Sequence, residues 1–549
     1  MRTTLPFRKN EVHTLSITGY TAEGRGVGRL LGAAVFVPGA ALGDTLNVRI
    51  LKTEKTYAYG KIEEIRTPSP DRIAPDCPQF GKCGGCAFRH LRYEAECRAK
   101  EQRVRDALER IGGCDPDLVQ PIHPAASPDR YRNKAQFPLG LDENGRLCAG
   151  FFAPHSHRIV PCEDCLLQPE VFRSAVRAVK RWHRETGESV YDEGTGKGRL
   201  RHLYLRAAMG DGGVMVCLVV NGSGVQNEAR LAELLREAVP GLQSVVLNMN
   251  TKRTNVILGP SSRTVWGEDH LTDTLCGLRF SISPHSFYQV NRDGAERLYE
   301  KAAEYAALSG NETLFDLYCG TGTIGLSMAH KAGRVIGVEV VEQAVADARE
   351  NAKRNGIENA EFFCADAPKA AARLKAQGVR PDVVVLDPPR KGCGEALVHT
   401  VAELAPRRVV YVSCDPATLA RDLKTFSACG YTLREATPFD LFPRTAHVET
   451  VVLLSKLNTK QHIEVELNLD ELDLTSAESK ATYEEIKAYV LEHTGLKVSH
   501  LYIAQVKQKY GIIERENYNK PKSENAKQPK CPPEKEAAIT EALKFFGMI

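Results

Sequence analysis

Residues 313–325 read Thr313-Leu-Phe-Asp316-Leu-Tyr-Cys-Gly320-Thr-Gly322-Thr-Ile-Gly325, and this stretch decides the fold of the second half of the chain. Its apolar start predicts a buried strand, and the glycines predict a tight turn into a helix. Glycines at the first turn of a doubly wound sheet let the backbone pass close to a ligand. The next apolar strand ends on Glu339, where a carboxylate can accept hydrogen bonds from two ribose hydroxyls. A ligand that carries a ribose is therefore expected here.

The same glycine spacing, with an acid about twenty residues further on, also satisfies the dinucleotide fingerprint. A nicotinamide-dependent oxidoreductase is therefore an alternative interpretation. Two features favour a methyltransferase that uses S-adenosylmethionine (AdoMet). Asp316 precedes the glycines by a few residues, and Asp387 stands in an Asp-Pro-Pro sequence at the tip of a later strand.

Strands and helices alternate through 289–457, which predicts a parallel sheet of Rossmann type. Two later strands end on Asp387 and Cys414, and the last strand begins near Glu449. A thiolate can add to an electron-poor ring carbon, and a carboxylate can then remove a proton from the neighbouring carbon. A lone cysteine is usually a buried thiol, and a lone glutamate is usually solvated. Their joint place at strand ends favours a catalytic pair.

A second group of residues is rich in cysteine. The chain has 16 cysteines, and Cys77, Cys83 and Cys86 fall within ten residues. Disulfides rarely persist in the cytoplasm, so a metal ion or an iron–sulfur cluster is the better explanation. Cys162 and Cys165 are the candidates for a fourth ligand. The spacing alone does not separate zinc from iron–sulfur, and plain buried thiols are the third possibility.

The remaining segments predict an α/β protein of several domains. Residues 1–75 alternate apolar and polar positions between glycines, which predicts a small antiparallel β-barrel. Residues 76–288 hold the cysteines and then mix strands with helices. In 458–549 a helical pattern at 482–494 precedes a Lys-, Asn- and Pro-rich stretch, 517–534, that is typical of disorder.

Composition narrows the class of protein. The apolar share of 42% is ordinary for a globular chain, and the net charge of +4 gives no global field for nucleic acid. No apolar run approaches the roughly 18 residues that a membrane span needs, and the first ten residues lack a signal peptide. A cytoplasmic protein without a membrane partner is expected.

Several motifs together resemble those of the RNA uracil-5 methyltransferases, over roughly residues 10–456. The best resemblance is to the bacterial branch that acts on 23S rRNA and carries a TRAM barrel and a [4Fe–4S] cluster. The motifs are Cys77-x5-Cys83-Gly-Gly-Cys86, Ser286-Phe-Tyr-Gln-Val-Asn291, Asp316-Leu-Tyr-Cys-Gly-Thr-Gly322, Leu386-Asp-Pro-Pro-Arg390, Tyr411-Val-Ser-Cys-Asp-Pro-Ala-Thr-Leu-Ala-Arg-Asp422 and His447-Val-Glu-Thr-Val451.

The resemblance implies a TRAM barrel at 1–75, an iron–sulfur and RNA-binding domain at 76–288, a class I methyltransferase domain at 289–457 and a C-terminal extension at 458–549. It also implies the chemistry. Cys414 would attack C6 of uracil, C5 would take the methyl group of AdoMet, and Glu449 would remove the C5 proton. The residues implied to hold AdoMet are Gln289, Tyr318, Glu339, Asp366 and Asp387.

For the cluster, the resemblance implies the ligands Cys77, Cys83, Cys86 and Cys165, the last because Cys-x-Leu-Gln matches the family pattern. Arg89 and Glu96-Cys97 depart from that pattern and are expected to affect substrate fit.

The partner would be RNA, most of all 23S rRNA, whose uracil must be extruded to reach Cys414. The basic stretches 131–137 and 199–206, with the barrel, could bind it. A monomer without an obligate protein partner is expected. The alternatives are a tRNA uracil-5 methyltransferase and a non-catalytic RNA-binding protein.

Overall fold

The computed structural model describes residues 5–456, 483–510, 531–546 and 548. Residues 1–458 pack as one compact unit and residues 459–549 as another. The expected boundaries at 75 and 288 lie inside the first unit, so the domain ranges stay predictions. Among the described helices, none is both long and apolar enough to cross a membrane.

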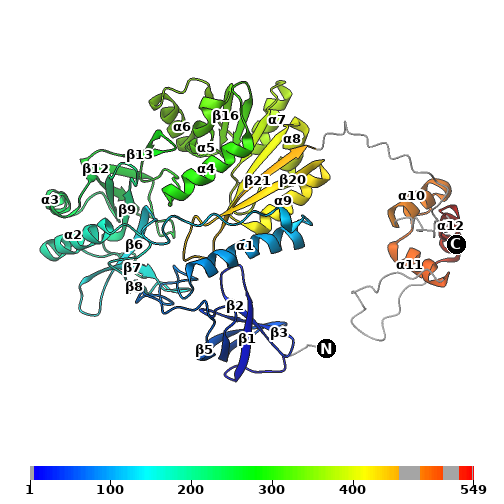
Figure 1. Cartoon of the computed structure of the whole chain (residues 1–549), viewed down its shortest axis with the longest axis horizontal. Coiled ribbons are helices and arrows are strands. Elements are labelled where there is room, and N and C mark those ends of the chain that lie inside the picture. The colour runs from blue at the N-terminus through cyan, green and yellow to red at the C-terminus, as the bar shows by residue number, and fades with distance from the viewer. Residues whose placement is uncertain (1–4, 457–482, 511–530, 547, 549) are drawn as a thin grey trace. The chain divides into compact units, whose positions relative to one another are not determined.

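The chain begins with a closed five-stranded barrel, drawn in blue in Figure 1. Around the barrel the order is β1-β2-β3-β5-β4, and β4 closes onto β1. The sequence predicted an antiparallel barrel, but β3 and β5 pair in parallel. An odd number of strands cannot alternate in direction all the way round, so one parallel pair is required. The strands are Val12–Tyr20 (β1), Gly26–Leu30 (β2), Ala33–Val37 (β3), Thr45–Thr53 (β4) and Tyr57–Thr67 (β5).

A loop with the first three cysteines leads from the barrel into helix α1, Tyr93–Arg110. The core of this helix packs against the last sheet of the chain and not against the cysteine loop. Its buried Val104 and Leu108 pack into the apolar layer beneath the last sheet of the chain. Helix α1 therefore joins the cysteine region to that sheet, as Figure 1 shows.

The central part is a seven-stranded sheet of order β12-β11-β10-β9-β6-β7-β8. Helices α2, Val171–Thr186, and α3, Glu228–Ala238, cover one face, where Trp182 is fully buried. A two-stranded hairpin follows the sheet. The strands are Lys134–Leu141 (β6), Leu147–Phe152 (β7), Ile159–Pro161 (β8), Leu200–Ala207 (β9), Val214–Val220 (β10), Leu242–Met249 (β11), Ser261–Gly267 (β12), Leu271–Leu275 (β13) and Leu278–Ile282 (β14).

The last sheet of the first unit has the order β17-β16-β15-β18-β19-β21-β20. The five strands from β15 to β19 run parallel, whereas β21 runs antiparallel to β19 and to β20. The strands are Thr313–Leu317 (β15), Arg334–Glu339 (β16), Ala360–Cys364 (β17), Val383–Leu386 (β18), Arg408–Ser413 (β19), Tyr431–Phe439 (β20) and Glu449–Lys456 (β21).

Helices cover both faces of this sheet, as the βαβ rhythm predicts. Helices α4 to α6 share one apolar layer, and α7 to α9 share the opposite layer with α1. The helices are Arg292–Ala306 (α4), Thr323–Met328 (α5), Glu342–Arg354 (α6), Ala367–Ala376 (α7), Glu395–Leu404 (α8) and Pro416–Ala428 (α9).

The second unit has three described helices around a small core of its own. They are Tyr483–Thr494 (α10), His500–Lys509 (α11) and Pro533–Phe545 (α12). Fully buried Ile486, Ile503 and Ile539 form its centre. Most of the stretch that is predicted to be disordered, 517–530, lies outside the described residues.

Candidate active site

Four chemical groups meet at one edge of the last sheet because parallel strands end together there. Glu339 closes β16, Asp387 follows β18 and Cys414 follows β19. Glu449 reaches the same edge from the other direction, because it begins the antiparallel strand β21. The register pairs Ser413 with Thr450, so their chain neighbours Cys414 and Glu449 lie beside this pair.

The edge opens into a cavity of about 1740 Å³. Typical small-molecule pockets hold roughly 300–1,000 Å³, so this cavity has room for a ligand and a second group beside it. All the residues that the sequence singled out for chemistry line it. They are Cys414, Glu449, Gln289, Tyr318, Glu339, Asp366, Asp387, Cys77, Cys83, Cys86, Cys162 and Cys165. Their roles stay predictions.

Burial shapes the acid–base properties of the thiol and the carboxyls. It raises the pKa of Glu449 to about 8, and nearby Asp387 adds to the shift. Burial and Asp316 raise the pKa of Asp387 to about 7. The pKa of Cys414 rises to about 11 through burial, with Glu449 and Asp387 as the next causes. Because each group disfavours the charge on another, the site is poised to accept positive charge.

Arg390 is the cation that opposes these shifts, since it lowers the pKa of both Cys414 and Glu449. Its guanidinium donates to Nε2 of His447 at 3.3 Å. Burial and Arg390 lower the pKa of His447 to about 4, so the imidazole is neutral and accepts this bond. Arg390 and His447 both stand in the quoted motifs, yet the sequence alone assigned them no role.

The glycine turn shows why its residues have to be small. Gly322 has φ 82° and Gly320 has φ 54°, both in the left-handed region. Tyr318, with φ 68°, adopts the same region without being glycine. The turn brings the backbone N–H of Gly320 to the carboxylate of Glu339 at 3.2 Å. Gly320 and Glu339 both line the cavity, and a tight turn beside an acid is the arrangement expected for ribose binding.

Two more acids flank the turn in different ways. Asp316 accepts the backbone N–H of Gly325 at 2.8 Å and is fully buried, so it holds the start of α5 in place. It does not line the cavity. Asp366 precedes α7 without bonding to that helix's N–H groups, and its carboxylate lines the cavity. Asp366 is therefore free to meet a ligand.

The cysteines line another part of the same cavity. The charge on Cys165 raises the pKa of both Cys83 and Cys86, the latter to about 12, although burial is the larger cause for both thiols. Cys162 donates to Cys165, which lowers the pKa of Cys165 to about 7. Among the residues that the structure describes, no three His, Cys, Asp or Glu side chains are arranged to hold a single metal ion.

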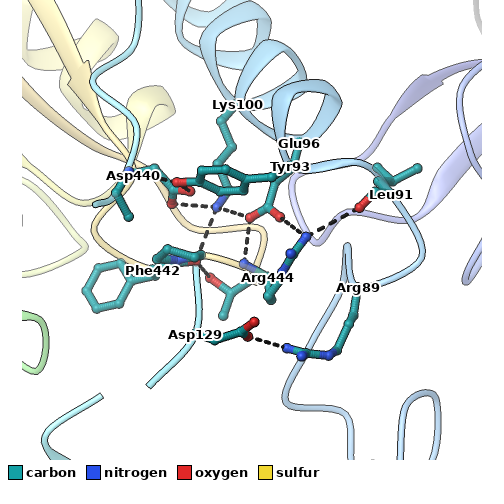
Figure 2. Close-up of polar contacts among 12 residues, drawn as sticks. Arg89, Leu91, Tyr93, Glu96, Lys100, Asp129, Asp440, Phe442 and Arg444 are labelled. Carbon is teal, nitrogen blue, oxygen red and sulfur yellow. Dashed lines mark hydrogen bonds and ion pairs between the residues drawn. The ribbon is translucent and has the colours of Figure 1, made fainter. Parts of the chain in front are cut away.

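Of the three residues that depart from the family pattern, Arg89 lines the cavity, whereas Glu96 and Cys97 do not. Glu96 and Cys97 are buried in α1, at 0% and 8% exposure. Arg89 is 2% exposed, and its guanidinium binds Asp76 at 2.5 Å. It also binds Asp129 at 2.8 Å, as Figure 2 shows. The side chains of Glu96 and Cys97 are packed inside the protein, and the expectation that the three residues affect substrate fit stays a prediction.

Comparison with known protein families gives two matches. Residues 266–457 match the family described as tRNA (uracil-5-)-methyltransferase, and residues 6–62 match the TRAM domain. The first match contains the edge of the sheet with Glu339, Asp387, Cys414 and Glu449. The second coincides with the barrel.

Relatives match most of the chain. An uncharacterized RNA methyltransferase from Halalkalibacterium halodurans is 44% identical over 453 residues, which are 82% of this chain and 99% of the relative. Another from Clostridium tetani is 42% identical over 461 residues, which are 84% of this chain and 100% of the relative.

A solved structure is similar as well. It is the Pyrococcus abyssi tRNA (uracil-54, C5)-methyltransferase in complex with S-adenosyl-L-homocysteine, at a TM-score of 0.66 and 27% identity. The similarity covers 80% of this chain and 100% of that chain. These matches favour methyl transfer over the nicotinamide alternative and over a protein without activity. The chain belongs to the RNA methyltransferase family of these relatives, with a catalytic region of the tRNA (uracil-5-)-methyltransferase type.

Proposed function

We propose that this AdoMet-dependent RNA uracil-5 methyltransferase modifies a specific uridine of 23S rRNA through a covalent adduct on Cys414. The observation that carries the proposal is the meeting of Cys414, Glu449 and Asp387 at one sheet edge, in a cavity large enough for a cofactor and a base. A uracil inside folded RNA has to leave its stack to reach such a site.

The thiolate of Cys414 adds its Sγ to C6 of the uracil. The resulting enolate makes C5 nucleophilic. AdoMet, when bound, supplies the methyl group to C5. Glu449 then removes the C5 proton, and the electron pair expels Sγ from C6. Cys414 is thereby released as a thiolate, and Glu449 holds the proton from C5. Arg390 stabilises the negative charge that Cys414 and Glu449 carry during these steps, since it lowers the pKa of both.

The cofactor residues have places that suit AdoMet. Glu339 at the glycine turn would accept from the ribose hydroxyls, and Asp366 would stand near the adenine. Asp387 and Gln289 would hold the part of AdoMet that lies nearest to the reacting carbon, with Tyr318 beside the turn. The carboxyls around Asp387 favour the positively charged sulfonium over the neutral sulfur of the product.

The substrate of this enzyme is either rRNA or tRNA. The TRAM barrel and the cysteine group support rRNA, by resemblance to the rRNA branch. The similarity to a solved tRNA (uracil-54, C5)-methyltransferase supports tRNA as the second candidate. Mapping 5-methyluridine in both RNAs from a deletion strain distinguishes them. Loss of one 23S rRNA position, with tRNA unchanged, is the expected result. We also expect the enzyme to act as a monomer in the cytoplasm.

Replacement of the nucleophile tests the chemistry. Cys414→Ala should abolish tritium release from RNA labelled at C5 of uridine, because no Sγ remains to activate C5. Binding of the same RNA should stay within about threefold of wild type. Cys429→Ala, at a partly exposed thiol of the same sheet region, is the control and should turn over normally. Full turnover by Cys414→Ala would refute the assignment.

A [4Fe–4S] cluster on Cys77, Cys83, Cys86 and Cys165 is part of the proposal. These four thiols line one cavity together with Cys162, and the charge on Cys165 raises the pKa of Cys83 and Cys86. The resemblance to the rRNA branch is what favours a four-iron cluster over a zinc ion at this place. The role of the cluster would be structural or RNA-docking, because methyl transfer moves no net electrons.

Anaerobic purification tests the cluster. The protein should be brown and should contain about four iron atoms per chain, and Cys86→Ser should lose both the colour and the iron. Cys97→Ser, at a buried thiol outside the ligand set, should keep them. Stoichiometric zinc without iron would contradict the cluster.

A further inference from the structure

The segment 440–447 connects β20 to β21 without regular structure and forms one wall of the cavity. Its residues Phe442, Thr445 and His447 line the cavity, and Glu449 follows two residues later. Arg444 within it has φ 68°, a region that non-glycine residues rarely adopt. A segment without a strand or helix keeps such a shape only when its surroundings hold it.

The surroundings bind the segment through its backbone carbonyls, and the donors come from outside the sheet. The bonds are Asn291 Nδ2 to Leu441 O at 3.0 Å, Lys100 Nζ to Phe442 O at 3.1 Å, Tyr131 Oη to Pro443 O at 3.0 Å, Ala87 N and Phe88 N to Arg444 O at 2.8 and 3.1 Å, and Arg103 Nη1 to Ala446 O at 2.8 Å. Helix α1 and the loop after Cys86 therefore determine the path of this wall.

Buried charges fix the same segment to α1, as Figure 2 shows. Lys100 is 1% exposed and lies between the carboxylates of Glu96 and Asp440, at 2.7 Å from each. The backbone N–H of Arg444 donates to Glu96 at 2.6 Å, and the Arg444 guanidinium stands 3.6 Å from the same carboxylate. Tyr93 donates its hydroxyl to Asp440 at 2.8 Å. The carboxylates of Glu96 and Asp440 are thus paired with the cations of Lys100 and Arg444, and all four side chains have little exposure to solvent.

The wall carries the neutral imidazole that holds Arg390. His447 accepts from the Arg390 guanidinium at 3.3 Å, and Arg390 offsets the negative charge at Cys414 and Glu449. A shift of the segment would therefore move Arg390 and the side chains that face the reacting base. Cys414 itself lies between β19 and α9, outside the segment.

We propose that Lys100 is a positioning residue of the methyl-transfer reaction, which acts through the cavity wall 440–447 from a site that the substrate does not touch. Lys100 binds both the first carboxylate of this segment and the carbonyl of Phe442, so it sets where His447 and Arg390 stand. The inference rests on the proposed function for its kinetic readout, but its structural readout is independent of that function.

The test compares three variants of the full chain. Lys100→Met leaves two buried carboxylates with too little positive charge, which destabilises the fold. The double variant Lys100→Met/Asp440→Asn removes one charge of each sign, so the remaining Glu96 still faces Arg444. Arg98→Met is the matched control, since Arg98 lies on the same helix in an exposed ion pair with Asp71.

The double variant should keep a melting temperature near that of wild type and a Kd for AdoMet within about twofold. Its kcat for methylation should fall at least tenfold, and amide hydrogen exchange in a peptide covering 440–448 should rise. Arg98→Met should change none of these.

A double variant that is stable, exchanges like wild type and turns over at the wild-type rate would show that Lys100 only stabilises the fold, and the inference would fail. If wild-type protein does not methylate RNA, the proposed function fails instead. Hydrogen exchange in 440–448 then still decides whether Lys100 holds the wall.

Discussion

In the proposed reaction, Glu449 has to ionise to remove a proton, but the site around it disfavours the charge. Its pKa of about 8 in the folded protein lies above the ordinary value of 4.5, through burial and Asp387. The folded state therefore holds the proton more tightly than the unfolded state. The stability linked to this proton is complete below about pH 4.5 and is lost as the pH rises through about 8. The catalytic carboxyl thus lowers the stability of the enzyme at the pH where it works.

Replacement of this carboxyl by an amide should stabilise the protein. Glu449→Gln should raise the melting temperature by about 1–3 °C at pH 8, with a smaller gain at pH 5.5, while methylation is lost. Calorimetry at the two pH values measures the effect. Glu358→Gln, at an exposed carboxylate, is the control. An equal gain at both pH values would show that the charge of Glu449 is not the cause.

At the scale of the elements, the barrel presents three aromatic rings outward. Phe36 on β3 and Tyr57 and Tyr59 on β5 lie 5.3–5.8 Å apart between ring centroids. They alternate with buried inward residues such as Val35 and Ala58. The Arg25 guanidinium stands 5.4 Å from the Tyr59 ring. Aromatic rings beside cations form the kind of surface on which the bases of single-stranded RNA stack.

Removal of these rings should weaken RNA binding. Phe36→Ala/Tyr59→Ala should lower the affinity for a target transcript about tenfold, since each stacked base contributes roughly 1–3 kcal/mol. AdoMet binding should not change. Val12→Ala, which truncates an exposed apolar side chain on β1, is the control. Fluorescence anisotropy measures both affinities, and an unchanged Kd for the double variant would exclude the rings from the RNA surface.

The elements also show what could be predicted from the sequence. The places of Asp387 and Cys414 followed from strand patterns, because the ends of parallel strands converge whatever lies elsewhere in the chain. The wall 440–447 could not be predicted in this way. Lys100 and Asp440 are separated by 340 positions, and neither lies in a sequence motif that predicts their contact. The parallel pair of β3 and β5 was missed too, since it follows from closure of the barrel.

At the scale of the whole molecule, the chain is longer than its relatives. The Halalkalibacterium halodurans relative matches 82% of this chain but 99% of its own length. The residues that line the cavity all belong to the first compact unit. The second unit, 459–549, has a core of its own. We therefore expect the first unit to catalyse the reaction alone.

Truncation tests this independence. A chain of residues 1–456 should fold, bind AdoMet and methylate RNA with a kcat within about twofold of the full chain. The melting transition of the first unit should not shift. Tritium release and calorimetry provide the two measurements. A loss of more than tenfold in kcat would mean that the extension contributes to the reaction.

The four buried charges of Figure 2 also bear on how such enzymes can recombine in evolution. Glu96 and Lys100 are encoded in one segment of the gene, and Asp440 and Arg444 in another. A crossover between relatives that keeps the first pair and replaces the second leaves unmatched charge in a dry interior, where it is costly. We therefore expect viable hybrids between relatives to have their junctions outside the span from Glu96 to Arg444.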